Sequence, residues 1–214
     1  IMKPFIESKD CDEIYKFLKE TSGKGIKIAP LSSNTFRTFL DTSLDDLKCV
    51  VIGRGPYARF EEGSPIATGV LFGSSINIQF DFVGFYEGIE NELFNGLNLE
   101  YIKTTDTEFL SQQGVLLLNN SLTVEKDKEN SHEGIWDTFI IHVLNNIPTD
   151  IPILLLGESN ERFEGVINDR PFRRISYPVM GNKWETEGVF TGIGKYLWEN
   201  EGESINWIFN DAPF

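Results

Sequence analysis

The stretch Val50-Val-Ile-Gly-Arg-Gly-Pro-Tyr57 begins as a run of β-branched residues and ends in a segment rich in Gly and Pro. An apolar run without alternating polar residues is typical of a strand that is covered on both faces. Gly and Pro directly after such a run predict a tight turn. We therefore expect a buried strand whose carboxyl end leads into a loop, and this pair of elements indicates the fold of the rest of the chain.

Short apolar runs of the same kind recur along the sequence. Together with the first, they are centred on residues 49–52, 114–118, 151–156 and 173–176. Apolar residues at helical spacing occupy 82–93, 136–143 and, after the last run, 193–197. Strands that alternate with helices predict crossover connections and a parallel sheet. We expect a single doubly wound α/β domain over residues 1–214, with a helical part in 1–48 and, in 49–214, a four-stranded parallel sheet flanked by helices.

The N-terminal part carries two helix signals. Ile14 and Leu18 fall at helical spacing behind Ser8, a residue type that caps helices. A second short helix is expected at 35–40, with Asn34 as its cap. Both helices precede the first sheet strand.

Composition limits the classes of protein to which the chain can belong. Its 214 residues, 40% of them hydrophobic, are enough to fill the core of one domain. No run of eighteen apolar residues and no signal-peptide pattern occurs, so we expect an intracellular protein, in cytoplasm or nucleus, without a membrane partner. Cys11 and Cys49 are interpreted as packing residues, and with only two histidines beside them we expect no metal site and no cofactor.

The formal net charge of −14 bears on nucleic-acid binding. A surface of that sign repels phosphate, whereas nucleic-acid binders neutralise several phosphates with Lys and Arg. Tight binding to duplex DNA without sequence preference is therefore not expected. The charge leaves three interpretations open: an ordinary solvated surface, an acidic face for a protein partner, or imitation of the charge of DNA.

Ligands of parallel α/β sheets lie beyond the carboxyl ends of the strands, where the winding direction reverses. In this chain the loops at those ends are 53–60, 119–132, 157–163 and 177–188. Functional residues are expected in these four loops.

Segments in and between these loops, taken in order, resemble the motifs of family 1 uracil-DNA glycosylases. Gly53-Arg-Gly-Pro-Tyr-Ala58 is similar to Gly-Gln-Asp-Pro-Tyr-His, and Gly69-Val-Leu-Phe72 to the segment with the Phe that stacks on uracil. Gly114-Val-Leu-Leu-Leu-Asn119-Asn-Ser-Leu-Thr-Val124, Tyr177-Pro178 and Ile205-Asn-Trp207 are similar to the later motifs. The resemblance runs from about residue 36 to residue 207 and implies the glycosylase fold.

The resemblance also implies a pocket for an extruded base. Its base-binding residues would be Arg54, Tyr57, Phe72, Asn119 and Tyr177. The Asn119 amide has a donor and an acceptor with which to pair with uracil, Phe72 would stack on the base, and Tyr57 would exclude the methyl group of thymine. Each also has a structural alternative: a turn residue for Asn119, core packing for Phe72 and an aromatic lid for Tyr57.

Basic residues near the same loops are candidates for the DNA backbone. Arg59 and Lys183 are assigned to it, and Arg54, Arg173 and Arg174 lie near the same loops. Ordinary surface ion pairs remain the alternative for these cations.

Three of the departures from the family pattern affect residues for cleavage or for holding the base out of the duplex. Gly55 stands where the family has its catalytic Asp, Tyr177 where it has His, and Gly181 where a Leu wedges into the duplex, with Met180 beside it. Cleavage passes through a cationic sugar and an anionic base, which a carboxylate and a hydrogen-bond donor stabilise. Loss of one such partner typically costs about 100- to 1000-fold. We therefore assign no catalytic residue, and Gly55 and Tyr177 count as degenerate positions.

Replacements for the missing acid are poorly placed in the sequence. Glu61 and Glu62 lie six and seven residues beyond Gly55, and Glu158 follows the third strand. Ser121 shares a loop with His132, but no acid completes a nucleophilic triad.

These observations lead to one preferred function and two alternatives. We expect a glycosylase-like pseudoenzyme of viral or bacterial DNA repair that binds uracil or a related pyrimidine in DNA, single-stranded DNA, or a protein partner in repair or replication. The first alternative is a divergent but active uracil-DNA glycosylase. The second is an acidic DNA mimic that inhibits a DNA-processing protein.

Overall fold

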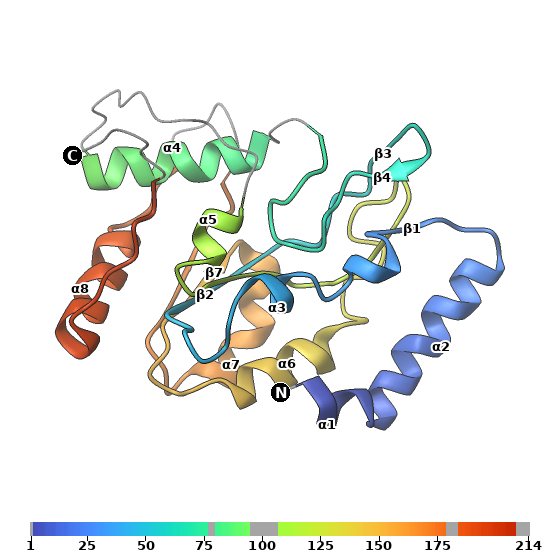
Figure 1. Ribbon diagram of the computed structural model, residues 1–214, viewed down its shortest axis with the longest axis horizontal. Helices are drawn as coiled ribbons and strands as arrows, with labels where there is room; N and C mark the ends of the chain where they lie inside the picture. Colours follow the sequence, from blue (N-terminus) through green and yellow to red (C-terminus); the bar gives the residue numbers. More distant parts are fainter. Residues whose placement is uncertain (1, 77–79, 95–106, 179–183, 209–214) are drawn as a thin grey trace.

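The computed structural model of the chain describes residues 2–76, 80–94, 107–178 and 184–208. Its centre is a four-stranded parallel sheet with the strand order β5-β2-β7-β8, flanked by helices (Figure 1). The strands of this sheet are β2 (Cys49–Gly53), β5 (Val115–Asn119), β7 (Ile153–Leu156) and β8 (Phe172–Ile175). The sheet and its helices confirm the predicted fold class, and all four predicted strands are present with ends shifted by two residues or fewer.

Helices follow most of the strands along the chain. The α-helices are α1 (Met2–Ile6), α2 (Lys9–Gly23), α3 (Thr38–Asp41), α4 (Phe80–Phe94), α5 (Glu108–Ser111), α6 (Asp137–Asn146), α7 (Glu164–Ile167) and α8 (Val189–Glu201). Two 3-10 helices are η1 (Ser32–Asn34) and η2 (Glu158–Phe163). Two small antiparallel pairs join β1 (Ile28–Ala29) to β6 (Val124–Glu125) and β3 (Phe60–Glu61) to β4 (Ser64–Pro65).

The sheet separates two apolar clusters, because successive residues of a strand point to opposite faces. Val51 and Leu117 pack with side chains of α4 and α8 in one cluster. Val50 and Leu116 pack with side chains of α6 and of the N-terminal helices in the other. In Figure 1, α4 lies on one side of the sheet and α6 on the other. All residues of β2, β5 and β7 are buried, which explains why these strands show no polar alternation in the sequence.

The N-terminal part confirms one capping prediction and corrects another. The Ser8 side chain accepts a hydrogen bond from the Cys11 amide at 3.2 Å and caps α2, as predicted. Asn34 does not cap a helix. It ends the 3-10 turn η1, its side chain accepts a bond from the Ser33 hydroxyl, and α3 begins only at Thr38.

Close packing fixes the end of β2. A Cβ atom on Gly53 would lie 2.4 Å from Leu71 Cδ1, so any larger residue here would require the buried Leu71 side chain to shift. The Leu71 amide in turn donates to the Leu117 carbonyl at 3.1 Å. These contacts hold segment 69–73 against the carboxyl ends of β2 and β5.

Along the chain, β2 is followed by its neighbour β5 on one side and then by β7 on the other, so the winding reverses at β2. The loops after β2, β5, β7 and β8 therefore open on one end of the sheet, where ligands of such folds bind. Within the described ranges, no helix is long and apolar enough to cross a membrane.

Candidate functional site

A small cavity lies beyond the carboxyl ends of β2 and β5. Its volume is about 10 Å³, close to the space of a single water molecule. The residues that line it are Gly55, Pro56, Tyr57, Val70, Leu71, Phe72, Gly73, Asp81, Asn119 and Tyr177. Four of the five residues assigned to base binding thus lie together, and the fifth, Arg54, places its guanidinium 4.3 Å from the centre of the Tyr177 ring.

Asp81, in the first turn of α4, closes this cavity. Its Oδ1 accepts a hydrogen bond from the Tyr57 hydroxyl at 2.6 Å, and its Oδ2 accepts one from the Tyr177 hydroxyl at 2.8 Å. Oδ1 also accepts the Phe82 amide at 3.0 Å. One carboxylate therefore joins the loop after β2 to the loop after β8. We call the Tyr57–Asp81–Tyr177 arrangement the tyrosine clasp.

Both phenols of the tyrosine clasp stay protonated. Burial, and after it the negative charge of Asp81, raises the pKa of Tyr57 and of Tyr177. The guanidinium of Arg54 opposes this increase at Tyr177 only in part. Each hydroxyl consequently donates to Asp81 and is not available to another acceptor while the clasp is closed.

Phe72 forms an aromatic wall of the cavity in an unfavourable backbone conformation. Its φ angle of +65° lies in the left-handed region, which bulky residues rarely adopt. A bond of 3.0 Å from the Gly73 amide to the Val70 carbonyl closes the turn that imposes this angle. The ring stacks on Phe82 with 5.5 Å between centroids and lies 6.1 Å from the Tyr177 ring. Phe72 is thus both part of the core and a wall of the cavity, and strain of this kind is typical of functional sites.

Asn119 is the last residue of β5, and its side-chain amide lines the cavity with a nitrogen that forms no hydrogen bond among the described residues. The side chain is only 2% exposed, and its Nδ2 has no hydrogen-bond partner among the described residues. A buried amide without a partner costs about 1–3 kcal/mol, so such groups are rare in folded proteins. Since Asn119 lines the cavity, its amide is placed to bind a polar ligand there.

The neighbouring amides, in contrast, are fully used and form the floor of the site. Asn160 is completely buried, and its Nδ2 donates to the carbonyls of Ile52, Gly53 and Leu156 at 2.8 to 3.3 Å. Its Oδ1 accepts a bond from Asn120 Nδ2 at 3.0 Å. We call these contacts the Asn160 network; they tie the ends of β2 and β7 to the loop after β5.

Gly55 leaves one wall of the cavity without a side chain. Its φ angle is not in the left-handed region, and a Cβ atom there would meet nothing closer than Ser121 Cβ at 3.6 Å. That separation is an ordinary van der Waals contact. The backbone at this position therefore has room for the Cβ atom of a larger residue.

Two of the four described cations of the predicted basic rim form ion pairs. Arg59 forms an ion pair with Glu61, and Arg174 with Glu164. For these two cations the alternative of surface ion pairs is the one that the contacts support. Arg173 donates to the Phe172 carbonyl. Lys183 lies outside the described residues, as do Met180 and Gly181 of the wedge position.

A polar groove of about 680 Å³ adjoins Tyr177 on the outer side. Three acids, Glu133, Glu158 and Glu187, line it, against the cations Arg54 and Arg174. Glu133 pairs with Arg162 and Arg174 pairs with Glu164, so the other charged residues of the lining are Glu158, Glu187 and Arg54, one more acid than cation. A DNA backbone is therefore weakly attracted here.

The acids considered as replacements for the catalytic Asp lie away from the cavity. Glu61 is bound to Arg59, and neither it nor Glu62 lines the cavity; Glu158 lines only the outer groove. The sequence interpretation missed Asp81, whose signal was its place at the start of a predicted helix. Among the described residues no cluster of His, Cys, Asp or Glu is arranged to hold a metal.

Ser121 and His132 do not form a nucleophile and base. The Ser121 hydroxyl donates to the carbonyls of Thr123 and His132, while Nδ1 of the His132 ring lies 2.8 Å from the Thr123 hydroxyl. Trp136 Nε1 donates to the same hydroxyl. These residues hold the loop together rather than react.

Comparison with known proteins settles the family. A uracil-DNA glycosylase of Francisella tularensis subsp. tularensis is 31% identical over 207 residues, which cover 91% of this chain and 90% of that protein. The chain belongs to the uracil-DNA glycosylase family. The glycosylase of Francisella tularensis subsp. novicida is 30% identical over a similar span. No protein-family model matches the sequence.

Solved structures of uracil-DNA glycosylases share the fold. The crystal structure of mimivirus uracil-DNA glycosylase matches with a TM-score of 0.81 at 18% identity, covering 96% of this chain and 83% of that one. A variant of the mimivirus protein, crystallised in complex with UGI, gives the same score. The UNG of Nitratifractor salsuginis matches with a TM-score of 0.56 at 17% identity, covering 86% of this chain and 82% of that one. The glycosylase fold therefore accounts for nearly the whole chain.

Proposed function

We propose that this uracil-DNA glycosylase homologue binds uracil in DNA and cleaves its glycosidic bond weakly or not at all. The observation that carries this proposal is the unpartnered amide of Asn119, buried beside a wall where Gly55 supplies no carboxylate. Recognition and cleavage depend on different residues of one pocket, so one can persist without the other.

Recognition of the base rests on three side chains. The Asn119 amide offers both a donor and an acceptor to the edge of a uracil ring. Phe72 provides a stacking face, which contributes on the order of 1–3 kcal/mol per base. Tyr57 lines the same cavity, where its ring would exclude the thymine methyl group once a base has entered.

Cleavage lacks two electrostatic partners in this pocket. The departing base becomes anionic and the sugar cationic, so a donor and a carboxylate lower the barrier. Gly55 supplies no carboxylate, and the Tyr177 hydroxyl is donated to Asp81. With each loss costing about 100- to 1000-fold, little turnover is expected, although such effects do not simply add.

The approach to the pocket supports a preference for open DNA. The groove beside Tyr177 is lined by three acids, Glu133, Glu158 and Glu187, and by two cations, Arg54 and Arg174. Duplex DNA presents a high density of phosphates and requires energy to extrude a base, whereas a single strand exposes its bases already. Uracil in a single strand is therefore the substrate to use in tests.

The experiment compares uracil release from a single-stranded oligonucleotide by the wild-type protein and by Gly55→Asp. We expect little release by the wild type and a large increase in the variant, since the position accepts a Cβ without a clash. Binding to uracil and thymine oligonucleotides is measured in parallel, and Asn119→Ala should abolish the preference for uracil. Efficient release by the wild type, or unchanged preference in Asn119→Ala, would contradict the proposal.

Asp81 supports a second candidate, an active glycosylase with a relocated acid. Its carboxylate lines the same cavity as Gly55 and Asn119, and it reaches that cavity from α4 instead of the loop after β2. Once the base displaces the two phenols, this carboxylate would face the sugar and stabilise its positive charge. In that case the wild type releases uracil, Asp81→Ala does not, and Gly55→Asp restores release in the Asp81→Ala background.

A further inference from the structure

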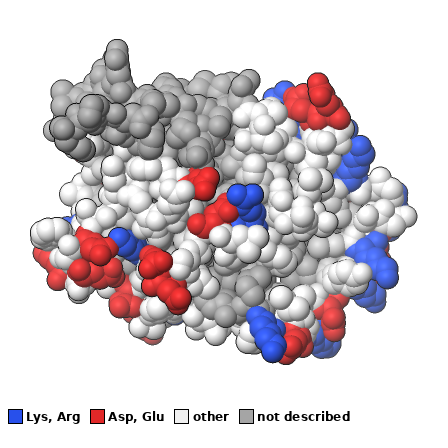
Figure 2. Space-filling model, viewed as in Figure 1, with Lys and Arg blue, Asp and Glu red and all other residues white. Residues whose placement is uncertain are grey.

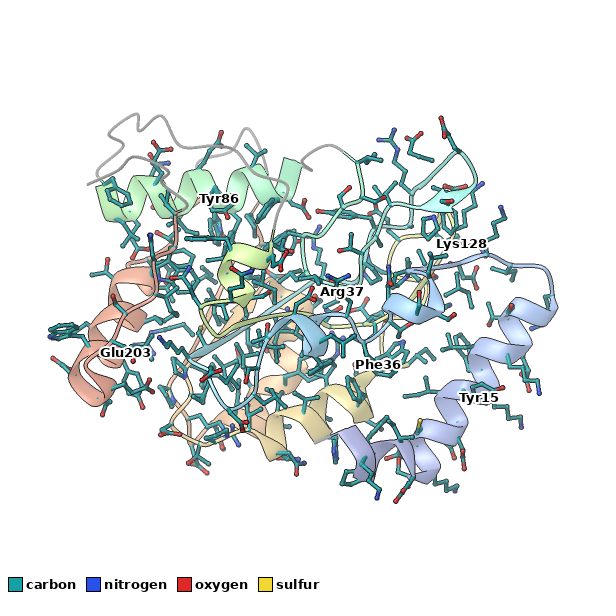
Figure 3. All side chains as sticks on the ribbon, viewed as in Figure 1. Tyr15, Phe36, Arg37, Tyr86, Lys128 and Glu203 are labelled. Atoms are coloured by element: carbon teal, nitrogen blue, oxygen red, sulfur yellow. The ribbon has the colours of Figure 1, made fainter. Side chains whose placement is uncertain are left out.

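A second groove lies on a different part of the molecule, between α2 and the β3–β4 hairpin. It has a volume of about 870 Å³, within the range of sites that accept a ligand or a peptide segment. Tyr15, Leu18 and Lys19 of α2 form one wall, and Phe60 and Pro65 of the hairpin form the other. Figure 3 shows Tyr15 on α2, at the edge of the molecule. We call this feature the α2–hairpin groove.

The groove exposes apolar side chains to solvent. Tyr15 is 64% exposed and Leu31, on the floor, is 54% exposed. Ile28 and Pro30 complete the apolar floor between the two walls. Exposed apolar residues that gather in one hollow mark a binding surface more often than scattered ones do.

The charge of the groove is opposite to that of the whole protein. Its lining contains Lys19 and Lys27 and no acidic residue, although the chain has a net charge of −14. The ammonium group of Lys19 lies 5.9 Å from the Tyr15 ring, and those of Lys27 and Lys126 lie about 6 Å from the Phe60 ring. Each lysine is thus held near an aromatic face without forming a buried ion pair.

The surface as a whole shows the same separation of charge. On the face drawn in Figure 2, most Lys and Arg side chains lie along the edge formed by α2 and the hairpin, with some acids among them. The opposite edge, formed by α8, is mainly acidic. An acidic partner is therefore drawn to the α2 edge in preference to α8.

We propose that the α2–hairpin groove binds a peptide segment of a protein partner that combines aromatic or aliphatic side chains with Asp and Glu. The apolar residues of such a segment would cover Tyr15, Leu31 and Phe60, and its acids would pair with Lys19 and Lys27. The complementary charge of the lining identifies the chemistry of this partner. The proposal does not depend on whether the base pocket cleaves.

A peptide fits the groove better than a nucleic acid does. Two lysines line it, whereas nucleic-acid sites neutralise a longer series of phosphates. Leu18, Ile28 and Pro65 supply aliphatic contacts that side chains of a peptide can cover and phosphates cannot. Single-stranded DNA is therefore retained only as a competing outcome of the test.

The position of the groove gives a bound partner access to the base-binding loop. Phe60, a wall of the groove, and Tyr57 of the tyrosine clasp both pack against the small cluster of Ala29, Ala58, Ala67 and Val124. A partner in the groove would contact Phe60, which packs against the same cluster as Tyr57. The groove thus adjoins the pocket through a shared set of alanine and valine side chains.

The test is a selection from a library of short random peptides displayed on phage, with the full chain as bait. Peptides that also bind the double variant Lys19→Glu/Lys27→Glu are removed by counter-selection. Both substitutions are at the surface and leave the core intact. We expect enriched peptides to be acidic and to contain aromatic or aliphatic residues. Synthetic copies should bind the wild type at least about tenfold more tightly than the double variant, and more weakly as salt increases.

Matched variants separate the groove from general surface effects. Leu31→Ser should weaken peptide binding, whereas Leu40→Ser, which changes a leucine that is 78% exposed outside the groove, should not. Lys16→Glu, on α2 but outside the lining, is the control for charge. The proposal is overturned if no peptide is enriched, if enriched peptides lack acids, or if they bind the groove variants equally well. It is also overturned if the binding of oligo-dT, used as the nucleic-acid probe, is weakened by the groove substitutions and the binding of peptides is not.

Discussion

Replacement of Asp81 by alanine should open the base pocket and increase its affinity for free uracil. The closed cavity of about 10 Å³ cannot hold a pyrimidine, so binding requires that Tyr57 and Tyr177 separate from Asp81. A hydrogen bond to a charged acceptor contributes about 1.5–3 kcal/mol net, since the phenols bond to water when the clasp opens. Asp81→Ala therefore removes about 3–6 kcal/mol of stabilisation from the closed state, which corresponds to at least about 100-fold in apparent affinity.

The assay is a titration of the folded variant and the wild type with free uracil by calorimetry. Because uracil is neutral, removal of the negative charge of Asp81 has little direct electrostatic effect on its binding. Asp41→Ala is the control, because it removes a carboxylate that pairs with Arg37 outside the cavity. If Asp81→Ala is folded and binds uracil no more tightly than the wild type, the tyrosine clasp does not limit access to the pocket.

Three further predictions concern stability. Burial lowers the pKa of His132, against an opposing effect of Glu125, so the unfolded chain takes up the proton first. The stabilisation from neutral His132 is complete above about pH 6.5 and is lost as the pH falls, by at most about 1.4 kcal/mol per pH unit. Urea unfolding midpoints measured on both sides of that pH check this. The dependence of the midpoint on pH should be flatter in His132→Gln. Gly53→Ala should cost about 1–3 kcal/mol in thermal melts, because its Cβ meets Leu71, whereas Gly55→Ala should change stability little. Ser8→Ala should destabilise the protein by about 1 kcal/mol, since the Ser8 hydroxyl caps α2, and unchanged urea midpoints would contradict the role of the cap.

The sheet could be predicted from sequence because its strands are buried on both faces. β2, β5 and β7 appear as continuous apolar runs, and the helices between them keep helical spacing. The pairing of β1 with β6 could not be predicted, because strands of two residues carry no periodicity. The prediction that Asn34 caps a helix was wrong. The Asn34 side chain bonds locally to Ser33, and three more residues form turns before α3 begins at Thr38.

The grouping of candidate residues around one cavity could be predicted where they belong to motifs that keep their order along the chain. Tyr57, Phe72, Asn119 and Tyr177 come from four such segments, and the structure gathers them around one cavity. Asp81 belongs to none of them. Its partners lie 24 and 96 residues away, and no rule of local spacing connects groups so distant in the chain.

The Asn160 network has a consequence for how this fold tolerates change. The network fastens the ends of β2 and β7 through the main-chain carbonyls of Ile52, Gly53 and Leu156. None of the residues with a proposed chemical role takes part in it. Substitutions at the positions with a chemical role therefore leave the hydrogen bonds of this network in place. The fold is for this reason suited to engineering in which a new active site is introduced at those positions.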